Sequence, residues 1–497
     1  MKVILAGYNL DTETIKELGW GKRGLPLTPE TISAAYARIS RSPKSVDRLR
    51  AEARHEIGKA RFSNRRIIFE MSHHSIAEHA VFNFDIIGIS RLAVEKLEKF
   101  RLCSYTEKSQ RYVTLKGDFV IPAEIKNTGL TEPYVKTIKL QNSFYSYLLK
   151  KIVVLNYKKF PNLAKYRANH RTLENWAKED ARYVLSLATQ TQVGATINAR
   201  NLELMIRRFA SNHFEEVRIL GKKLYETIRK IAPSIILFYR ANDYDQKTNS
   251  ELFGYAGRQG YGEAEKQGCR DVNLRLVDHT PYGDEKVLAA LLFKVANNSH
   301  ARCLQIVKKM TIKQKLDLFK QACKYMELYD VAPREFEYAS LVYSMAVSAG
   351  CFGQLKRHRL ASIVTQDYDP RLGYTLPESV REVGEETKFN EIIQKTEDIF
   401  EKIEKKLPGV GSYILTNAHR KMVLIGVNLR ELYHISRLRE DPTAQWDIRK
   451  IAQQMSACAA RVMPVTTGLL GGKTDYPEIY RRHFGSYPKI TEVPPIK

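Results

Sequence analysis

The sequence has few cysteines and no long apolar run. Its six cysteines lie far apart and form no Cys-x-x-Cys pair, which argues against a disulfide framework and against a structural zinc site. The apolar run at residues 3–6 is too short for a signal peptide, and no stretch approaches the length of a membrane span. We therefore expect a cytoplasmic protein with free thiols and no membrane partner.

Acidic residues are scarce relative to basic ones. The chain has 80 Lys and Arg against 55 Asp and Glu, which gives its 497 residues a formal net charge of +25. Such a surplus attracts anionic partners, including nucleotides, phosphorylated cofactors and nucleic acid. The basic residues are spread along the chain, and the sequence lacks an arginine-rich arm, an aromatic RNA-binding signature and zinc-finger spacing. We therefore expect an anionic ligand but no nucleic acid partner.

What the sequence does contain is an internal duplication. Residues 78–112 and 337–366 each begin with a strand-like run, continue as a helical run with an apolar side, and end in a polar loop rich in basic residues. A strand and a helix that deliver such a loop hold hydrogen-bond donors on a rigid frame. We therefore divide the chain into a first half (1–239), a linker (240–270) and a second half (271–497).

The pattern predicts the same order of elements in the two halves. The expected elements include strands at residues 2–6 and 272–277, a helix at 29–39 capped by Thr28, and helices at 196–209 and 427–438. Residues 240–270 have no apolar period, which is typical of a linker. Their run GYAGRQGYG could instead be a phosphate-binding loop, although no strand precedes it and no Gly-Lys-Ser/Thr closes it.

Two further motifs are weak indications of a metal site and of a reactive thiol. The run MSHHSIAE at residues 71–78 contains a histidine pair, but its spacing to His79 differs from the helical His-Glu-x-x-His pattern, so we expect no metal. Cys103 lies among cations that lower a thiol pKa. Its counterpart in the second copy is Ala361, which favours a small buried residue over a nucleophile.

The two basic loops resemble a family signature. The stretch KFRLCSYTEKSQRY is similar to the flavin-dependent thymidylate synthase motif R-H-R-x-x-S-x-N-x-x-S-x-R. The first half keeps four of its positions and departs at three: Arg101, Ser104, Ser109 and Arg111 remain, whereas Lys99, Phe100 and Thr106 differ. The second half keeps the first four and loses the rest: Arg357, His358, Arg359 and Ser362 remain, whereas Val364, Asp367 and Asp369 differ.

The departures in the two halves are complementary. The resemblance implies a homotetramer in which each nucleotide site is shared. One subunit would supply the phosphate loop, and another would supply the remaining nucleotide contacts. The loop set survives in the first half, where the resemblance assigns dUMP contacts to Glu107, Lys108, Ser109, Gln110, Arg111 and Arg182. The other set survives in the second half, as Gln354, Arg357 and the catalytic Arg439. The position of Arg439 in the first half is Phe209.

The same resemblance implies a set of flavin contacts. These are His73, Ser75, Glu107, Arg357, His358 and Arg359, together with Asn198 and Arg200 or their second-half equivalents Asn428 and Arg430. Either Asn-x-Arg pair fits the pattern. His434 stands where the family has Asn, so that contact departs from the family.

The resemblance therefore implies an α/β (α+β) protein with two tandem copies of the flavin-dependent thymidylate synthase fold, each a mixed sheet with long flanking helices. The implied activity is reductive methylation of dUMP to dTMP with FAD, NADPH and methylenetetrahydrofolate. The alternatives are flavin- and folate-dependent methylation of uracil in RNA, and a non-catalytic nucleotide- or flavin-binding paralogue. A homodimer of the tandem chain would equal a pseudo-tetramer.

Overall fold

The computed structural model describes residues 1–126, 128–259 and 274–491. The chain forms two compact units. The first unit comprises Met1–Lys266 and Pro377–Thr416, and the second comprises Gln267–Leu376 and Asn417–Lys497. The compact units thus divide the chain differently from the two sequence halves, because a segment of the second half packs into the first unit. The half boundaries themselves stay a prediction.

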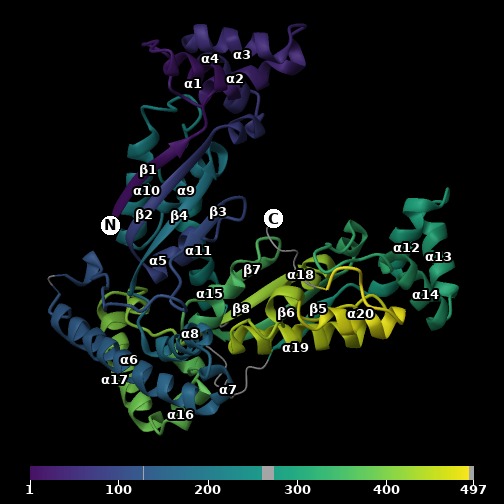
Figure 1. Ribbon diagram of the computed structural model, residues 1–497. Helices are drawn as coiled ribbons and strands as arrows, with labels where there is room; N and C mark the ends of the chain where they lie inside the picture. Colours follow the sequence, from purple (N-terminus) through teal and green to yellow (C-terminus); the bar gives the residue numbers. More distant parts are fainter. Residues whose placement is uncertain (127, 260–273, 492–497) are drawn as a thin grey trace. The chain divides into compact units, whose positions relative to one another are not determined.

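Within the described residues, each unit contains a four-stranded sheet with the same strand order, β1-β2-β4-β3 in the first and β5-β6-β8-β7 in the second (Figure 1). The strands are β1 Lys2–Tyr8, β2 Val81–Ser90, β3 Ser104–Glu107, β4 Gln190–Asn198, β5 Arg275–His279, β6 Ser340–Ser348, β7 Ser362–Thr365 and β8 Arg420–Asn428. The repeated order confirms two tandem copies of one α+β fold. Every described pairing is antiparallel, so the expectation of mixed sheets was wrong. Helical segments connect consecutive strands along the chain. These connections are long enough for each strand to pair antiparallel with its neighbour in the sheet.

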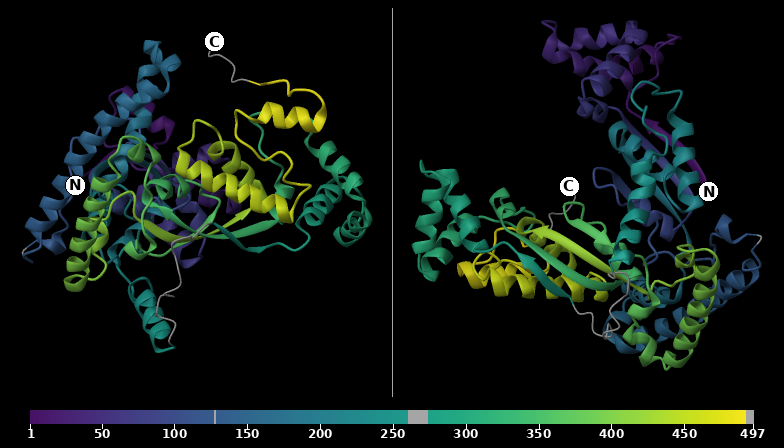
Figure 2. Two further views of the ribbon diagram at one scale, coloured as in Figure 1. Left: turned by 90° about the horizontal axis from the view of Figure 1, so that it is seen from below. Right: turned by 180° about the vertical axis from the view of Figure 1, so that it is seen from behind.

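Helices flank both sheets. In the first unit they are α1 Thr12–Gly19, α2 Glu30–Arg38, α3 Val46–His55, α4 Ile57–Arg65, α5 Arg91–Leu97, α6 Thr131–Lys159, α7 Pro161–Ala164, α8 His170–Ala181, α9 Ala199–Ala210, α10 Glu215–Ile228, α11 Asp243–Arg258, α16 Glu378–Glu382 and α17 Glu386–Lys406. In the second unit they are α12 Gly283–Val295, α13 His300–Lys309, α14 Ile312–Cys323, α15 Ala349–Leu355, α18 Leu429–Arg439, α19 Trp446–Val462 and α20 Tyr476–Phe484. Figure 2 shows α19 lying across the sheet of the second unit. In the parts of the chain that are described, no helix is both long and apolar enough to cross a bilayer.

The helices next to the sheets begin at equivalent polar residues. The Ser90 hydroxyl caps α5 by accepting from the Ala93 N–H at 3.0 Å, and Ser348 caps α15 in the same way. Asn198 and Asn428 cap α9 and α18. Each cap satisfies a backbone donor that the first turn of a helix leaves without an intrahelical partner. The four caps therefore fix where strand ends and helix begins in both copies.

The strands β4 and β8 were missed by the sequence analysis. Helices were expected from residues 196 and 427, whereas the strands continue to Asn198 and Asn428 before the helices begin. The burial pattern of β4 alternates strictly, with its inward positions buried and its outward positions accessible. That alternation has the period of a half-buried strand, and it was overlooked because the helical pattern that follows is stronger.

Other expectations at the N-terminus and in the linker have mixed outcomes. The strand at residues 2–6 is confirmed, and the helix at 29–39 is confirmed as α2, although Pro29 and not Thr28 holds its cap position. The supposed linker contains α11, whose residues are all at least partly exposed, which explains the missing apolar period. The rest of the linker from residue 260 on, including part of GYAGRQGYG, and residues 272–273 of the expected strand lie outside the described residues.

In the first unit, equivalent segments of the two halves meet. Ser186 and Thr416 form an isolated antiparallel bridge, and each lies twelve residues before the Asn cap of the next helix. The Leu187 N–H donates to the Leu415 carbonyl at 2.8 Å. Nearby, α17 packs along α6 (Figure 1). The first unit is therefore completed by α16 and α17, which come from the second half of the chain.

We expect Gln141→Leu to destabilise the first unit. Gln141 is fully buried on α6, and its Nε2 donates to Thr396 Oγ1 at 2.8 Å and to the Ile414 carbonyl at 3.1 Å. Losing the donor leaves a buried carbonyl without this hydrogen bond, so the free energy of unfolding should fall by about 1–3 kcal/mol. Hydrogen exchange of α6 amides under native conditions measures it. Ser146→Ala, on an exposed turn of the same helix, is the control, and equal protection in both variants would contradict the assignment.

Candidate functional site

The first unit contains a well-defined loop directly after β3. Glu107 ends the strand, and the Lys108 N–H donates to the Gln192 carbonyl at 2.9 Å. The Ser109 hydroxyl accepts from the Arg111 N–H at 3.1 Å, which closes a tight turn. Glu107 and Gln110 are buried, whereas Lys108 is exposed. The loop of the predicted dUMP residues is thus held by β4 on one side and by its own turn on the other.

Three arginines gather around this loop. Arg91 Nη1 donates to Glu107 Oε1 at 2.5 Å, Arg111 forms an ion pair with Glu179, and Arg182 Nε donates to the Glu179 carbonyl at 3.2 Å. Burial lowers the pKa of Arg182, and the nearby Arg91 and Arg111 lower it further. Two of these guanidinium groups therefore pair with carboxylates, and the third donates to a backbone carbonyl. A phosphate binding here would gain charge-assisted hydrogen bonds and relieve the repulsion between the arginines.

The equivalent loop of the second unit is organised differently. Asp369 stands where Arg111 does, and its carboxylate caps the following turn and pairs with Arg371 at 2.7 Å. The buried Lys421 lies 3.7 Å from the Phe352 ring centroid and 4.2 Å from that of Tyr368. The aromatic faces stabilise the lysine by cation–π attraction. Lys421 of β8 thus places a cation against this loop, and the loop has Asp367 and Asp369 at the positions of Ser109 and Arg111.

The second unit brings together three other predicted residues. Arg439 Nε, at the end of α18, donates to His358 Nε2 at 3.0 Å, and Arg439 Nη2 donates to the Gln354 carbonyl at 3.2 Å. Gln354 Nε2 in turn donates at 3.3 Å to Gln445 Oε1, which also caps α19. Gln354 and His358 are buried. The end of α15 and the end of α18 are therefore joined by one polar network.

The same positions in the first half carry an aromatic pair. Phe100 lies ten residues after Ser90, as His358 lies ten after Ser348, and Phe209 lies eleven residues after Asn198 as Arg439 does after Asn428. The two Phe rings meet edge to face with centroids 5.7 Å apart. The histidine–arginine contact of one copy is therefore an aromatic contact in the other, and both partners changed together.

The predicted flavin residues His73 and Ser75 are exposed and line a pocket of about 430 Å³ in the first unit. Tyr36, Arg41 and His79 contribute to the same pocket. The Tyr36 and His79 rings meet edge to face at 4.7 Å. The pocket combines ring surfaces with a cation, which suits a cofactor that has both aromatic and phosphate groups.

The two predicted Asn-x-Arg pairs lie in matching surroundings. Asn198 and Asn428 cap their helices, as described above. Arg200 pairs with Glu78 at 2.5 Å, and Arg430 pairs with Glu337 at 2.9 Å, so each uses the glutamate that opens its copy of the repeat. Which pair contacts flavin stays open. The remaining predicted flavin residues of the second unit are exposed: Arg357, Arg359 and His434.

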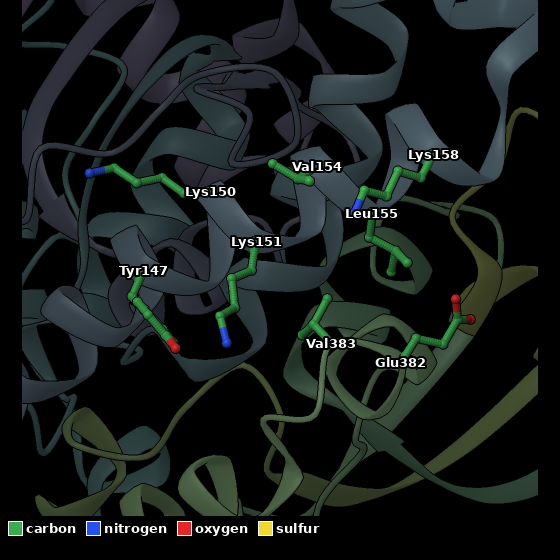
Figure 3. Close-up of a pocket in the computed structure, with 8 residues that line it drawn as sticks. All are labelled: Tyr147, Lys150, Lys151, Val154, Leu155, Lys158, Glu382 and Val383. Carbon is green, nitrogen blue, oxygen red and sulfur yellow. The ribbon is translucent and has the colours of Figure 1, made fainter.

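A second pocket of the first unit contains none of the predicted residues. It measures about 490 Å³ and lies between α6 and α16, with Lys150, Lys151 and Lys158 among its lining residues (Figure 3). Lys151 forms an ion pair with Glu385, which also accepts from the Tyr147 hydroxyl at 2.7 Å. Part of its positive charge is thus neutralised locally, and we assign no ligand to it.

Sequence reasoning missed several residues of these networks. Arg91 and Glu179 complete the arginine cluster, Glu431 approaches His358, and Lys421 fills the second loop. Comparing the two copies would have identified Arg91, since its counterpart is Ala349 and that of its partner Glu107 is Thr365. Glu179 carries no such signal, because its contact depends on how α8 packs.

The chain matches the family model described as thymidylate synthase complementing protein over residues 26–234 and again over 275–465. The chain belongs to this family. The two matched segments confirm the tandem form inferred from the repeated loops.

Three curated proteins and one solved structure are similar to this chain. A UPF0159 protein of Chlamydia muridarum is 25% identical over 418 residues, 80% of this chain and 78% of its own length. A UPF0159 protein of Thermoplasma acidophilum is 25% identical over 447 residues, 82% of this chain and 87% of its own. A flavin-dependent thymidylate synthase of Clostridium tetani is 30% identical over 214 residues, which cover 82% of that protein but only 42% of this chain. The solved structure of thymidylate synthase X from Helicobacter pylori with FAD and dUMP aligns with a TM-score of 0.30 and 17% identity over 48% of this chain and 99% of its own.

We expect Arg111→Ala to weaken dUMP binding. The substitution removes one of the three guanidinium groups at the first-unit loop, so affinity should fall by about 1.5–3 kcal/mol, the range for a hydrogen bond to a charged group. Isothermal titration calorimetry with dUMP measures it. Arg371→Ala is the matched control, because this arginine lies in the equivalent loop of the second unit and pairs with Asp369. Unchanged affinity in Arg111→Ala, or an equal loss in the control, would refute the assignment.

Proposed function

We propose that this protein catalyses the FAD-dependent reductive methylation of dUMP to dTMP, with methylenetetrahydrofolate as carbon donor and NADPH as reductant. The observation that carries the proposal is the complementary state of the two copies. The first unit retains the phosphate loop and its arginines, and the second retains the Gln354–His358–Arg439 network. A decaying protein would lose such residues without this pattern.

The proposed nucleotide site combines the two sets. The phosphate of dUMP would bind the Ser109–Arg111 turn together with Arg182, because bidentate arginines match phosphate geometry. Gln354 and Arg357 would contact the rest of the nucleotide. Since the described part of the chain contains one such arginine cluster and one such network, we propose one dUMP site per chain, formed where a first-half loop meets a second-half helix. A homodimer would then hold two sites.

Arg439 has the clearest chemical role in this proposal. A guanidinium beside the pyrimidine would stabilise negative charge developing on the ring at N3, which raises the nucleophilicity of C5. Carbon–carbon bond formation at C5 then needs no cysteine adduct. The C5–H bond would break with loss of a proton, and the methylene carbon would bond to C5 as its bonds to the folate nitrogens break and tetrahydrofolate leaves. A hydride equivalent that comes from NADPH by way of the flavin would complete the methyl group.

The residues present fit a flavin. The pocket lined by His73 and Ser75 offers ring surfaces and a cation, and Arg357 and Arg359 are exposed cations of the second unit. Bound FAD would supply the hydride equivalent. Cations near the isoalloxazine favour its reduced, anionic form. All the proposed ligands are anionic, in keeping with the net charge of +25.

Release of tritium from C5-labelled dUMP is the deciding experiment. We expect release that depends on methylenetetrahydrofolate and NADPH. Arg439→Ala should lower turnover far more than dUMP binding, because its main interaction is made in the transition state. Release from C5-labelled uracil in RNA, with none from dUMP, would support the RNA alternative. A yellow protein that releases no tritium from either would indicate the non-catalytic alternative.

A second prediction separates the roles of the two copies toward flavin. Only the second half has the intact Arg-His-Arg triplet. Replacing both Arg357 and Arg359 with Ala should therefore give colourless protein, whereas Lys99→Ala, at the first position of the triplet in the first half, should leave flavin largely bound. The flavin absorbance of the purified variants measures this. Equal loss of colour in the two variants would contradict the division of roles.

A further inference from the structure

Glu431 is a buried carboxylate that the proposed ligand contacts do not use. It lies in the first turn of α18 and is only 3% exposed. Its Oε1 lies 3.4 Å from Nδ1 of His358, a ring that is itself 2% exposed. Burying a carboxylate is costly unless a partner compensates for the lost water. A buried acid that faces a buried histidine therefore needs an explanation.

The contact on the other side of the histidine shows which tautomer is present. A guanidinium has only donors, so His358 Nε2 must accept the hydrogen bond from Arg439 Nε at 3.0 Å. The proton of the neutral ring is then on Nδ1, the ring atom that lies 3.4 Å from Glu431 Oε1. These two buried atoms are in contact without an aligned hydrogen bond, and within the described residues neither has another hydrogen-bond partner. Burial lowers the pKa of His358, which favours this neutral form, and the Arg439 charge acts in the same direction. Glu431 opposes that shift, and the third ionisable neighbour is His434, whose ring centroid is 5.6 Å away.

The first half provides an internal comparison. The counterpart of Glu431, three residues after the Asn cap, is Asn201. Its side chain donates to Asn198 Oδ1 at 2.9 Å, within its own helix cap. The counterparts of His358 and Arg439 are Phe100 and Phe209. All three positions thus change together: acid, histidine and arginine in one copy, and amide and two aromatic rings in the other.

We propose that Glu431 is a positioning residue for Arg439. The negative charge of Glu431 beside Nδ1–H holds His358 in one tautomer, and the Nε2 lone pair then fixes the direction of the Arg439 guanidinium. The role of Arg439 on the pyrimidine rests on the proposed function, but the tautomer of His358 does not. Glu431 would orient Arg439 through His358. Carboxylates that hydrogen-bond to metal-bound histidines orient those histidines in the same way.

The test observes the histidine directly. Full-length protein labelled with ¹⁵N-histidine is studied by magic-angle-spinning NMR, and His358→Asn identifies the His358 signal among the 12 histidines. We expect the Nδ1–H tautomer in the unsubstituted protein and in Glu431→Gln, whose amide oxygen can still accept. In Glu431→Leu the ring should lose this single tautomer. Glu440→Gln, a partly buried acid at the other end of α18 that hydrogen-bonds to Ser456, is the matched control.

Kinetics provide the second readout. In Glu431→Leu, kcat for tritium release should fall about tenfold, the lower range for loss of such an orienting partner, with dUMP affinity little changed and activity largely restored in Glu431→Gln. An Nε2–H tautomer in the unsubstituted protein would overturn the proposal even if Glu431→Leu fails to fold. So would an unchanged tautomer or kcat in Glu431→Leu. If the unsubstituted protein releases no tritium, the proposed function fails, and the NMR result alone decides the role of Glu431.

Discussion

Burying an ionisable side chain is unfavourable unless opposite charge or hydrogen bonds replace the lost water. This constraint shapes both candidate networks. In the first unit, Arg91 pairs with Glu107, Arg111 pairs with Glu179, and Arg182 donates to the Glu179 carbonyl, so three cations gather at one loop. In the second unit, His358 lies between Arg439 and Glu431, and burial lowers its pKa. A bound phosphate would therefore add to the stability of the first unit, in addition to being its ligand.

The two copies differ in sets of contacting residues. Arginine and histidine in contact in one copy are two phenylalanines in contact in the other. The Arg91–Glu107 ion pair of the first half is Ala349 and Thr365 in the second. Changing one member alone would leave a buried polar group without its partner, which costs more than changing both. Coupled change of this kind explains how a duplicated fold can specialise its halves without losing stability.

The first unit also depends on chain from the second half. Backbone hydrogen bonds join residues 187–188 to the segment that ends at Thr416, and α17 packs on α6. Buried Gln141 connects these elements. The arginine cluster is built on this region, since Arg182 directly follows α8. Part of the second half of the chain therefore supports the phosphate loop of the first unit. This support does not depend on which residues complete the nucleotide site.

The sequence by itself determined the duplication, the family, and the residues around the two loops, because these depend on local spacing and side-chain chemistry. It also placed β1 and α2 correctly, since apolar periodicity is a local property. The tertiary structure alone decided which segments complete each unit, that both sheets are antiparallel, and that β4 and β8 precede the Asn caps. It alone showed the partners Glu179, Lys421 and Glu431, because contacts between residues far apart in sequence depend on how helices pack against the sheets, and no local pattern records that packing.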